Sequence, residues 1–228
     1  VRLQTELTAE EVEFLSYQQN LKIQALGALK QGKSKDDFLF SIMIFKAFMS
    51  SPIAALSSIE NRLEKVEKLS STSDKYEDSL EVLKEHQRLL KNILDSKSDS
   101  KYQKLKQTLM ELGWSGKKKD ERFVVFAERI ATLEYLKENL TKGFGLTEDA
   151  IESFSGSDSD VEQQKKIEDF GQGDSKVRIL LCSDAGSQGV NLHFYCNRMM
   201  NYDIPWSLIT LEQRNGRIDR YGQKKTPY

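Results

Sequence analysis

The amino-acid sequence predicts a mainly helical region over residues 1–115, followed over residues 116–228 by a parallel α/β sheet flanked by helices. Apolar residues in the first part recur every three or four positions, as they do in amphipathic helices. In the second part, short apolar runs alternate with helical patterns, which is typical of a doubly wound parallel sheet. The composition changes around residues 113–121, and we place the boundary there.

Helical stripes of apolar residues organise the first part. They cover residues 12–29, 56–69, 76–94 and 102–112, with polar breaks at residues 70–74 and 96–100. In the first stripe, Val12 and Leu15 are expected on the buried side. We expect an antiparallel helical hairpin with further helices appended to it. Such stripes usually form a core, so no chemistry is assigned to them.

Four short runs in the second part suit strands, and three helical patterns accompany them. The expected strands are residues 123–126, 151–154, 177–182 and 198–202, and the expected helices are residues 130–140, 160–170 and 209–219. Ile130 and Leu133 begin the expected core side of the first of these helices. Ligands gather at the carboxyl ends of parallel strands, so the loops after Cys182 and Tyr202 point to a site near the last helix.

The composition limits the classes of function. The chain has 228 residues, of which 38% are hydrophobic and 30% charged, and its net charge of −1 argues against polyanion binding through bulk charge. No apolar stretch is long enough for a bilayer, so no membrane partner is expected. The two cysteines, Cys182 and Cys196, indicate neither a disulfide framework nor a metal site. We therefore expect a reducing, cytoplasmic setting.

Residues 27–34 read Gly-Ala-Leu-Lys-Gln-Gly-Lys-Ser, which formally satisfies the pattern of a phosphate-binding loop. A working loop of this kind follows a buried strand and opens a helix. Here the preceding residues carry helical periodicity instead. We therefore interpret Gly32 as the end of a helix, followed by a polar turn, and do not assign nucleotide binding to this segment.

A stretch near the end of the chain concentrates arginine. Residues 213–223 read Gln-Arg-Asn-Gly-Arg-Ile-Asp-Arg-Tyr-Gly-Gln. In a helix, Gln213, Arg217 and Arg220 would share one face at positions i, i+4 and i+7. Guanidinium groups can fork two hydrogen bonds to phosphate oxygens, which suits phosphoryl transfer. A solvated basic helix end is the alternative for this stretch taken by itself.

A second segment upstream favours the phosphate interpretation. Residues 183–192 read Ser-Asp-Ala-Gly-Ser-Gln-Gly-Val-Asn-Leu. The glycines allow close backbone approach, and the hydroxyl and amide groups offer contacts to phosphate or ribose. Together the two segments resemble motifs V and VI in the second motor lobe of superfamily 2 helicases and translocases, and residues 123–128 resemble motif IV.

Within that superfamily, the arginine stretch is most similar to the Swi/Snf-like branch and especially to its RapA (HepA) type. Residues 48–56 resemble the segment that precedes a helical insertion in bacterial relatives. The resemblance is specific over residues 123–223 and looser before them, and Tyr221 stands where an aliphatic residue is commoner. It implies a RecA-like lobe that closes on a first RecA-like lobe of the same protein, with ATP and Mg²⁺ between the two.

The resemblance to motif VI implies roles for individual residues. Arg217 and Arg220 are expected to be arginine fingers that reach the γ-phosphate, and Gln213 is expected to orient phosphate or the attacking water. Arg214 is expected to form a structural ion pair or to touch phosphate rather than to take part in catalysis. The metal ligands and most ATP contacts are expected on the first lobe.

The resemblance to motif V implies two further pairs of residues. Gly189 and Asn191 are expected to line the nucleotide side of the loop. Ser183 and Ser187 are expected to contact the nucleic-acid backbone, which holds a track without reading its sequence. Hydrogen bonding within the loop is the alternative for both serines.

Two functions follow as expectations. The first is a motor lobe of an ATP-driven translocase that acts on double-stranded nucleic acid, expected to be DNA, and remodels a bound protein complex. The second is a degenerate lobe that serves as a protein-interaction module through its helical hairpin. The presence of Gln213, Arg217 and Arg220 favours the motor. Because no phosphate-binding loop or Asp-Glu pair follows a strand, we expect this chain alone not to hydrolyse ATP.

Overall fold

A computed structural model describes residues 3–30, 35–70, 77–185 and 191–221. The chain divides into two compact units, residues 4–103 and residues 104–228 together with residues 1–3. Helix α5 (Ser100–Glu111) crosses this division. A functional boundary near residue 115 stays a prediction. Nowhere in the described ranges does a helix combine the length and apolar character needed to cross a bilayer.

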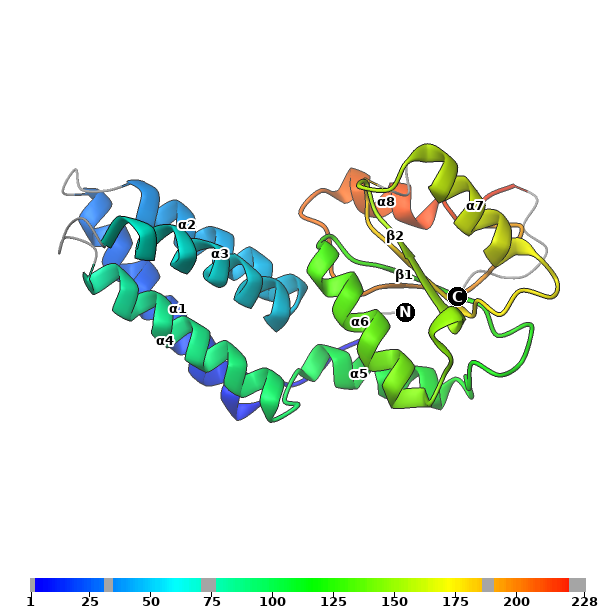
Figure 1. The fold of residues 1–228 in the computed structure, drawn as a ribbon, viewed down its shortest axis with the longest axis horizontal. Coiled ribbons are helices and arrows are strands. Elements are labelled where there is room, and N and C mark those ends of the chain that lie inside the picture. The colour runs from blue at the N-terminus through cyan, green and yellow to red at the C-terminus, as the bar shows by residue number, and fades with distance from the viewer. Residues whose placement is uncertain (1–2, 31–34, 71–76, 186–190, 222–228) are drawn as a thin grey trace. The chain divides into compact units, whose positions relative to one another are not determined.

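The first unit contains a bundle of four helices. They are α1 (Ala9–Lys30), α2 (Lys35–Ser50), α3 (Pro52–Ser70) and α4 (Glu77–Asp95). Helix α1 packs against α2 and α4, and α3 packs against the same two helices. Consecutive helices run in opposite directions (Figure 1). Gly27 lies inside α1, so a helix and not a strand precedes the phosphate-loop pattern, while Gly32 lies outside the described residues.

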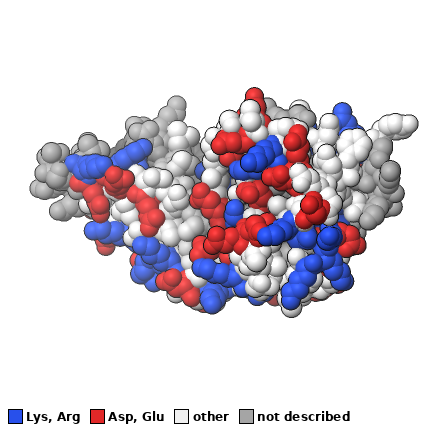
Figure 2. All heavy atoms as spheres, turned by 45° about the vertical axis from the view of Figure 1, so that its right-hand side comes forward, with Lys and Arg blue, Asp and Glu red and all other residues white. Residues whose placement is uncertain are grey.

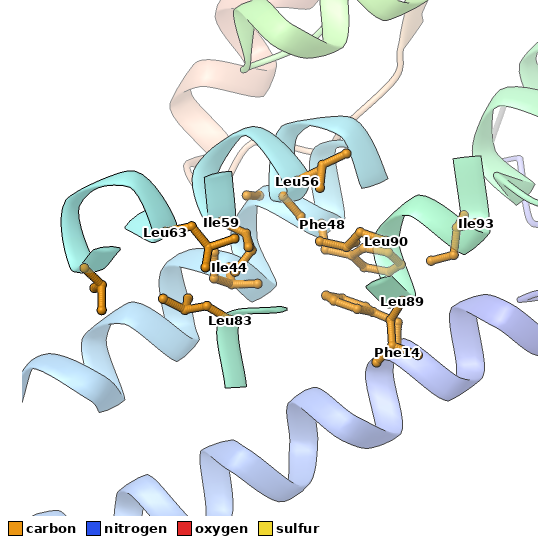
Figure 3. Close-up of a cluster of buried hydrophobic side chains, with 13 residues drawn as sticks. Phe14, Ile44, Phe48, Leu56, Ile59, Leu63, Leu83, Leu89, Leu90 and Ile93 are labelled. Atoms are coloured by element: carbon orange, nitrogen blue, oxygen red, sulfur yellow. The ribbon is translucent and has the colours of Figure 1, made fainter. Parts of the chain in front are cut away.

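The core of the bundle is built from aliphatic and aromatic side chains of all four helices (Figure 3). The rings of Phe14 and Phe48 lie 4.5 Å apart between centroids. Val12, which was expected on the buried side of α1, is 48% exposed. The buried side is instead formed by Glu11, Phe14 and Gln18, which follow the helical spacing of three and four. Periodicity of apolar residues missed this face because two of its members are polar.

Hydrogen bonds explain why polar side chains are buried in the bundle. Gln18 donates to the carbonyl oxygen of Ser41 at 2.7 Å, and its Oε1 lies 2.7 Å from Nε2 of His86. The Glu11 carboxylate accepts from the Thr8 N–H and the Ser100 N–H, both at 3.0 Å. Glu11 thereby caps α1 and also fixes the first turn of α5.

The second unit contains a four-stranded parallel sheet, as predicted. The strands are β1 (Phe123–Phe126), β2 (Ile151–Phe154), β3 (Ile179–Cys182) and β4 (Met199–Asn201), in the order β2-β3-β1-β4. The first two match their expected limits, and the last two are shorter than expected. Helices α6 (Ile130–Phe144), α7 (Asp160–Gly171) and α8 (Leu208–Asn215) accompany them, with a short 3-10 helix at Glu148–Ala150.

The topology places α6 and α7 on opposite faces of the sheet. The connection from β1 to β2 passes two places along the sheet, and the connection from β2 to β3 returns one place. Because parallel crossovers are right-handed, opposite directions put the two helices on opposite faces, as Figure 1 shows. Helix α6 buries Leu133, Leu136 and Leu140 as expected, whereas Ile130, its first residue, is 47% exposed.

The α7 face of the sheet is also covered by the end of the chain. Leu192, Cys196 and Ile218 belong to the same buried cluster as Phe126 of β1 and Phe170 of α7. This packing holds Leu192 and Cys196, and the segment that follows α8, against the sheet. Both cysteines are buried, and neither forms a disulfide.

Candidate functional site

The carboxyl ends of three neighbouring strands lie level at one edge of the sheet. The register pairs Phe126 of β1 with Cys182 of β3 and with Asn201 of β4. The residues that follow these strands therefore meet at this edge, where ligands gather in parallel sheets. Two of them are aspartates, Asp184 after β3 and Asp203 after β4.

Arg214, in the last turn of α8, joins these strand ends, and its side chain is only 1% exposed. Its Nε and Nη2 donate to the two carboxylate oxygens of Asp184 at 2.5 and 2.7 Å. Nη2 also donates to the Asp203 carboxylate at 3.2 Å, and Nη1 donates to the Asp203 carbonyl at 2.8 Å. The guanidinium carbon lies 5.6 Å from the centroid of the Phe126 ring.

The charge of Arg214 is well compensated. Burial works against the charged form, but the hydrogen bonds and charges of Asp184 and Asp203 outweigh it and raise the pKa of the guanidinium. Asp203 is fixed in turn, because its second carboxylate oxygen accepts the Glu128 N–H at 2.8 Å. The structural ion pair that the sequence suggested for Arg214 is confirmed.

The chain leaves the helical path one residue after Arg214. Helix α8 ends at Asn215, not near residue 219, so Gln213, Arg217 and Arg220 do not form one continuous helical face. Gly216 is a poor helix former, and Ile218 turns into the core, where it is 3% exposed. The expected helical face is wrong because burying Ile218 against the sheet redirects the chain.

The turn after α8 brings Arg217 and Arg220 close to the end of the upstream loop. The carbonyl oxygen of Arg217 accepts the Leu192 N–H at 3.0 Å, and Arg220 donates to the side-chain oxygen of Asn191. Burial, and then the positive charge of Arg220, lower the pKa of Arg217. Two positive charges that repel one another at a partly buried position favour the binding of an anion beside them.

The remaining expected site residues differ in how they are placed. Gln213 is exposed on the last turn of α8. Ser183 is 4% exposed at the end of β3, and its N–H donates to the Phe154 carbonyl at 3.2 Å. Ser187 and Gly189 lie outside the described residues. Within the part of the chain that is described, no three His, Cys, Asp or Glu side chains are arranged to hold a metal ion.

Sequence reasoning did not assign Asp184 and Asp203 to the site. Asp203 directly follows the expected strand 198–202, and Asp184 follows the expected strand 177–182 after one residue, Ser183. The position of a carboxylate within two residues of the end of an expected strand was the available signal.

The profile of the helicase conserved C-terminal domain matches residues 100–222. The chain belongs to this family. It is 32% identical over 205 residues to the ATP-dependent helicase YqhH of Bacillus subtilis, covering 88% of this chain and 32% of that protein. It is 34% identical over 108 residues to the RNA polymerase-associated protein RapA of Vibrio cholerae, covering 47% and 11% of the two chains. The chain therefore spans about a third of the length of the first relative, and its match covers about a tenth of the second.

Two solved structures share the fold. The helicase domain of Pyrococcus furiosus Hef matches with a TM-score of 0.52 and 18% identity, covering 90% of this chain and 43% of that one. The C-terminal part of the Fun30 ATPase domain matches with a TM-score of 0.59 and 17% identity, covering 98% and 81%. The expected RecA-like lobe and the resemblance to Swi/Snf-like superfamily 2 proteins of RapA type are confirmed.

Proposed function

We propose that the chain is the second motor lobe of an ATP-dependent nucleic-acid translocase or helicase of Swi/Snf-like type, with residues 116–228 as the RecA-like lobe. The observation that carries the proposal is that one turn places Arg217 and Arg220 beside Asn191 and Leu192, through the hydrogen bonds from Arg220 to Asn191 and from Leu192 to Arg217. Fixed positive charges of this kind stabilise the charge that develops on a transferring phosphoryl group. Arg217 and Arg220 are the proposed arginine fingers, and Gln213 the residue that orients phosphate or water.

ATP and Mg²⁺ are proposed to lie mainly on a first RecA-like lobe of the same protein, which carries the metal ligands. Asn191, which already accepts a hydrogen bond from Arg220, and Gly189 are proposed to line the nucleotide side of the cleft. This chain alone would then lack most of the ATP site and be inactive. Its arginines become useful only when the two lobes close.

Double-stranded DNA is the proposed track, held by Ser183 and Ser187 through its backbone. Acidic and basic side chains are interspersed on the face in view in Figure 2, and the net charge of the chain is −1, so contacts by individual groups suit this chain better than binding through bulk charge. The name of RapA records an association with RNA polymerase. By analogy, we propose a protein complex in the cytoplasm as the object that is remodelled.

The test is ATP turnover by the full-length protein with and without duplex DNA. Changing Arg217→Ala or Arg220→Ala should lower kcat by about 1,000-fold or more, because arginine fingers contribute that much in related phosphoryl transfers. Arg88→Ala is the matched control, since Arg88 is an exposed arginine of the bundle. Unchanged turnover in both finger variants would end the motor assignment and favour the alternative, a degenerate lobe that acts as a protein-interaction module.

A further inference from the structure

We propose that the outer face of α2 in the helical bundle docks an amphipathic helix of a partner protein, whose apolar stripe is bordered by Asp and Glu. The outer face of α2 is formed by Leu39, Ile42, Met43, Lys46 and Met49. It belongs to the first compact unit, so its role goes beyond the proposed motor function and does not depend on it.

Helix α2 is apolar on both of its sides. Its inner side carries Ile44 and Phe48, which point into the core of the bundle (Figure 3). The outer face keeps helical spacing, at i, i+3, i+4, i+7 and i+10 counted from Leu39, and all of its residues except Lys46 are apolar. A helix that is apolar all round is ordinarily buried all round, which indicates that a further element covers the outer face.

Among the described residues, the outer face remains accessible. Leu39, Met43 and Met49 are 58%, 39% and 47% exposed, and Ile42 is partly buried. Helices α1 and α3 pack against α2, and both contribute to the core on its inner side. Apolar side chains that are gathered on one exposed face mark interaction sites, whereas singly scattered ones do not. The flexible thioethers of the two methionines can adapt to the side chains of a docked helix.

The charges at the outer face are positive. Lys46 is exposed on the face itself. Arg62 of α3 borders it, because its guanidinium carbon lies 5.3 Å from the centroid of the Phe40 ring, next in sequence to Leu39. Within the described ranges Arg62 makes no ion pair with a carboxylate. A helix whose apolar stripe is bordered by carboxylates therefore complements this surface in both polarity and charge.

A second copy of the chain fits the outer face less well. Pairing of two outer faces about a two-fold axis brings the same surface of each chain together. Lys46 lies between Met43 and Met49, so the two lysine ammonium groups would approach each other, with an Arg62 on each side. Like charges across a contact are unfavourable, and the complementary carboxylates are therefore assigned to a different protein.

The measurement is the binding of two labelled synthetic peptides to the full-length protein, followed by fluorescence anisotropy. Each peptide has about 18 residues, because shorter isolated helices are marginal in water, and each carries a leucine stripe at helical spacing. One has glutamates beside the stripe and the other has lysines. The glutamate peptide should bind about fivefold more tightly, as two exposed ion pairs would allow. Arg62→Glu should remove most of this preference.

The apolar contribution is tested by Met43→Ser. This change should weaken the binding of the glutamate peptide by about tenfold, since it removes apolar contacts at the middle of the face. Met110→Ser is the matched control, because Met110 is a methionine of α5 that is 61% exposed and lies outside the outer face. It should bind the peptide as the wild type does. Both substitutions are on the surface, so the thermal midpoint of either variant should stay within about 3 °C of the wild type.

Other results would overturn the proposal. If neither peptide binds at about 1 mM, or if both bind equally well, the face does not dock an acidic helix. Dimerisation of the wild type that Met43→Ser abolishes would assign the face to a second copy. A lower thermal midpoint in Met43→Ser but not in Met110→Ser would assign it to another segment of the same polypeptide. ATP turnover of Met43→Ser should equal that of the wild type, so a failure of the docking proposal leaves the test of Arg217 and Arg220 unaffected.

Discussion

Arginine side chains lie at both ends of the sheet, but different groups surround their charges. At the carboxyl end, Arg214 is paired with Asp184 and Asp203. At the amino end, Arg122 and Arg178 directly precede β1 and β3, and the register of these strands makes them neighbours. No carboxylate in the described part of the chain forms an ion pair with either.

Main-chain carbonyl groups take the place of carboxylates at the amino end. Arg122 donates to the carbonyl oxygens of Gly171 and Gln172, at the carboxyl end of α7, and its guanidinium lies 5.6 Å from the centroid of the Phe170 ring. Arg178 donates to the Ser175 carbonyl at 2.6 Å. A positive charge at the end of a helix is favourable, and it satisfies carbonyls that the helix leaves open.

The pKa values of Arg122 and Arg214 shift in opposite directions. Burial, and then the charge of Arg178, lower the pKa of Arg122. At the carboxyl end the carboxylates outweigh burial and raise the pKa of Arg214. Burial of an arginine therefore does not by itself identify a functional residue. Arg214 differs from Arg122 because its two counter-ions, Asp184 and Asp203, follow different strands, and Arg214 links them.

The largest expected effect is on stability when Arg214 loses its charge. Arg214→Met should lower the free energy of unfolding of the second unit by about 3–5 kcal/mol, because it leaves the buried carboxylate of Asp203 without its cation. Both tryptophans, Trp114 and Trp206, lie in this unit, so denaturant unfolding followed by tryptophan fluorescence reports on it. Adding Asp203→Asn should recover part of the loss; a double variant less stable than Arg214→Met would contradict the ion-pair explanation.

The sequence predicted the strands and helices well where one short segment carries the whole pattern. Strand β1 is a run of four buried apolar residues, and α6 buries Leu133 at the expected spacing. The prediction failed where contacts with residues distant in the sequence determine which side chains are buried and where a helix ends. Gln18 is buried through partners in α2 and α4, and α8 ends early because Ile218 packs on the sheet.

The candidate site followed the same rule. The arginines of residues 213–223 were recognised because their spacing is local and specific. The ion pair between Arg214 and Asp184 joins residues 30 positions apart, and no periodicity contains it. Only the order of strands in the sheet brings the two side chains to one edge.

A smaller effect is expected at the amino end. Arg122→Met should lower the free energy of unfolding by about 1–2 kcal/mol, because it loses hydrogen bonds from a charged group to the end of α7. The methionine keeps contact with Phe170, and the neighbouring charge of Arg178 is relieved. The same fluorescence measurement checks this. A loss as large as that of Arg214→Met would mean that carbonyl groups hold the partly buried Arg122 as tightly as carboxylates hold Arg214.

The smallest expected effect is the interaction free energy within two pairs of residues, Arg122 with Arg178 and Arg214 with Asp184. Its sign should differ between the two pairs. Removing either Arg122 or Arg178 relieves the repulsion between them, but the double variant relieves it only once. The double variant Arg122→Met with Arg178→Met should therefore cost about 0.5 kcal/mol more than the sum of the single costs. Arg214→Met and Asp184→Asn each lose the attraction between Arg214 and Asp184, so the sum of the two single losses counts it twice. The double variant should therefore lose less stability than that sum. Equal signs in these two cycles, measured by denaturant unfolding, would remove the distinction between the two ends of the sheet.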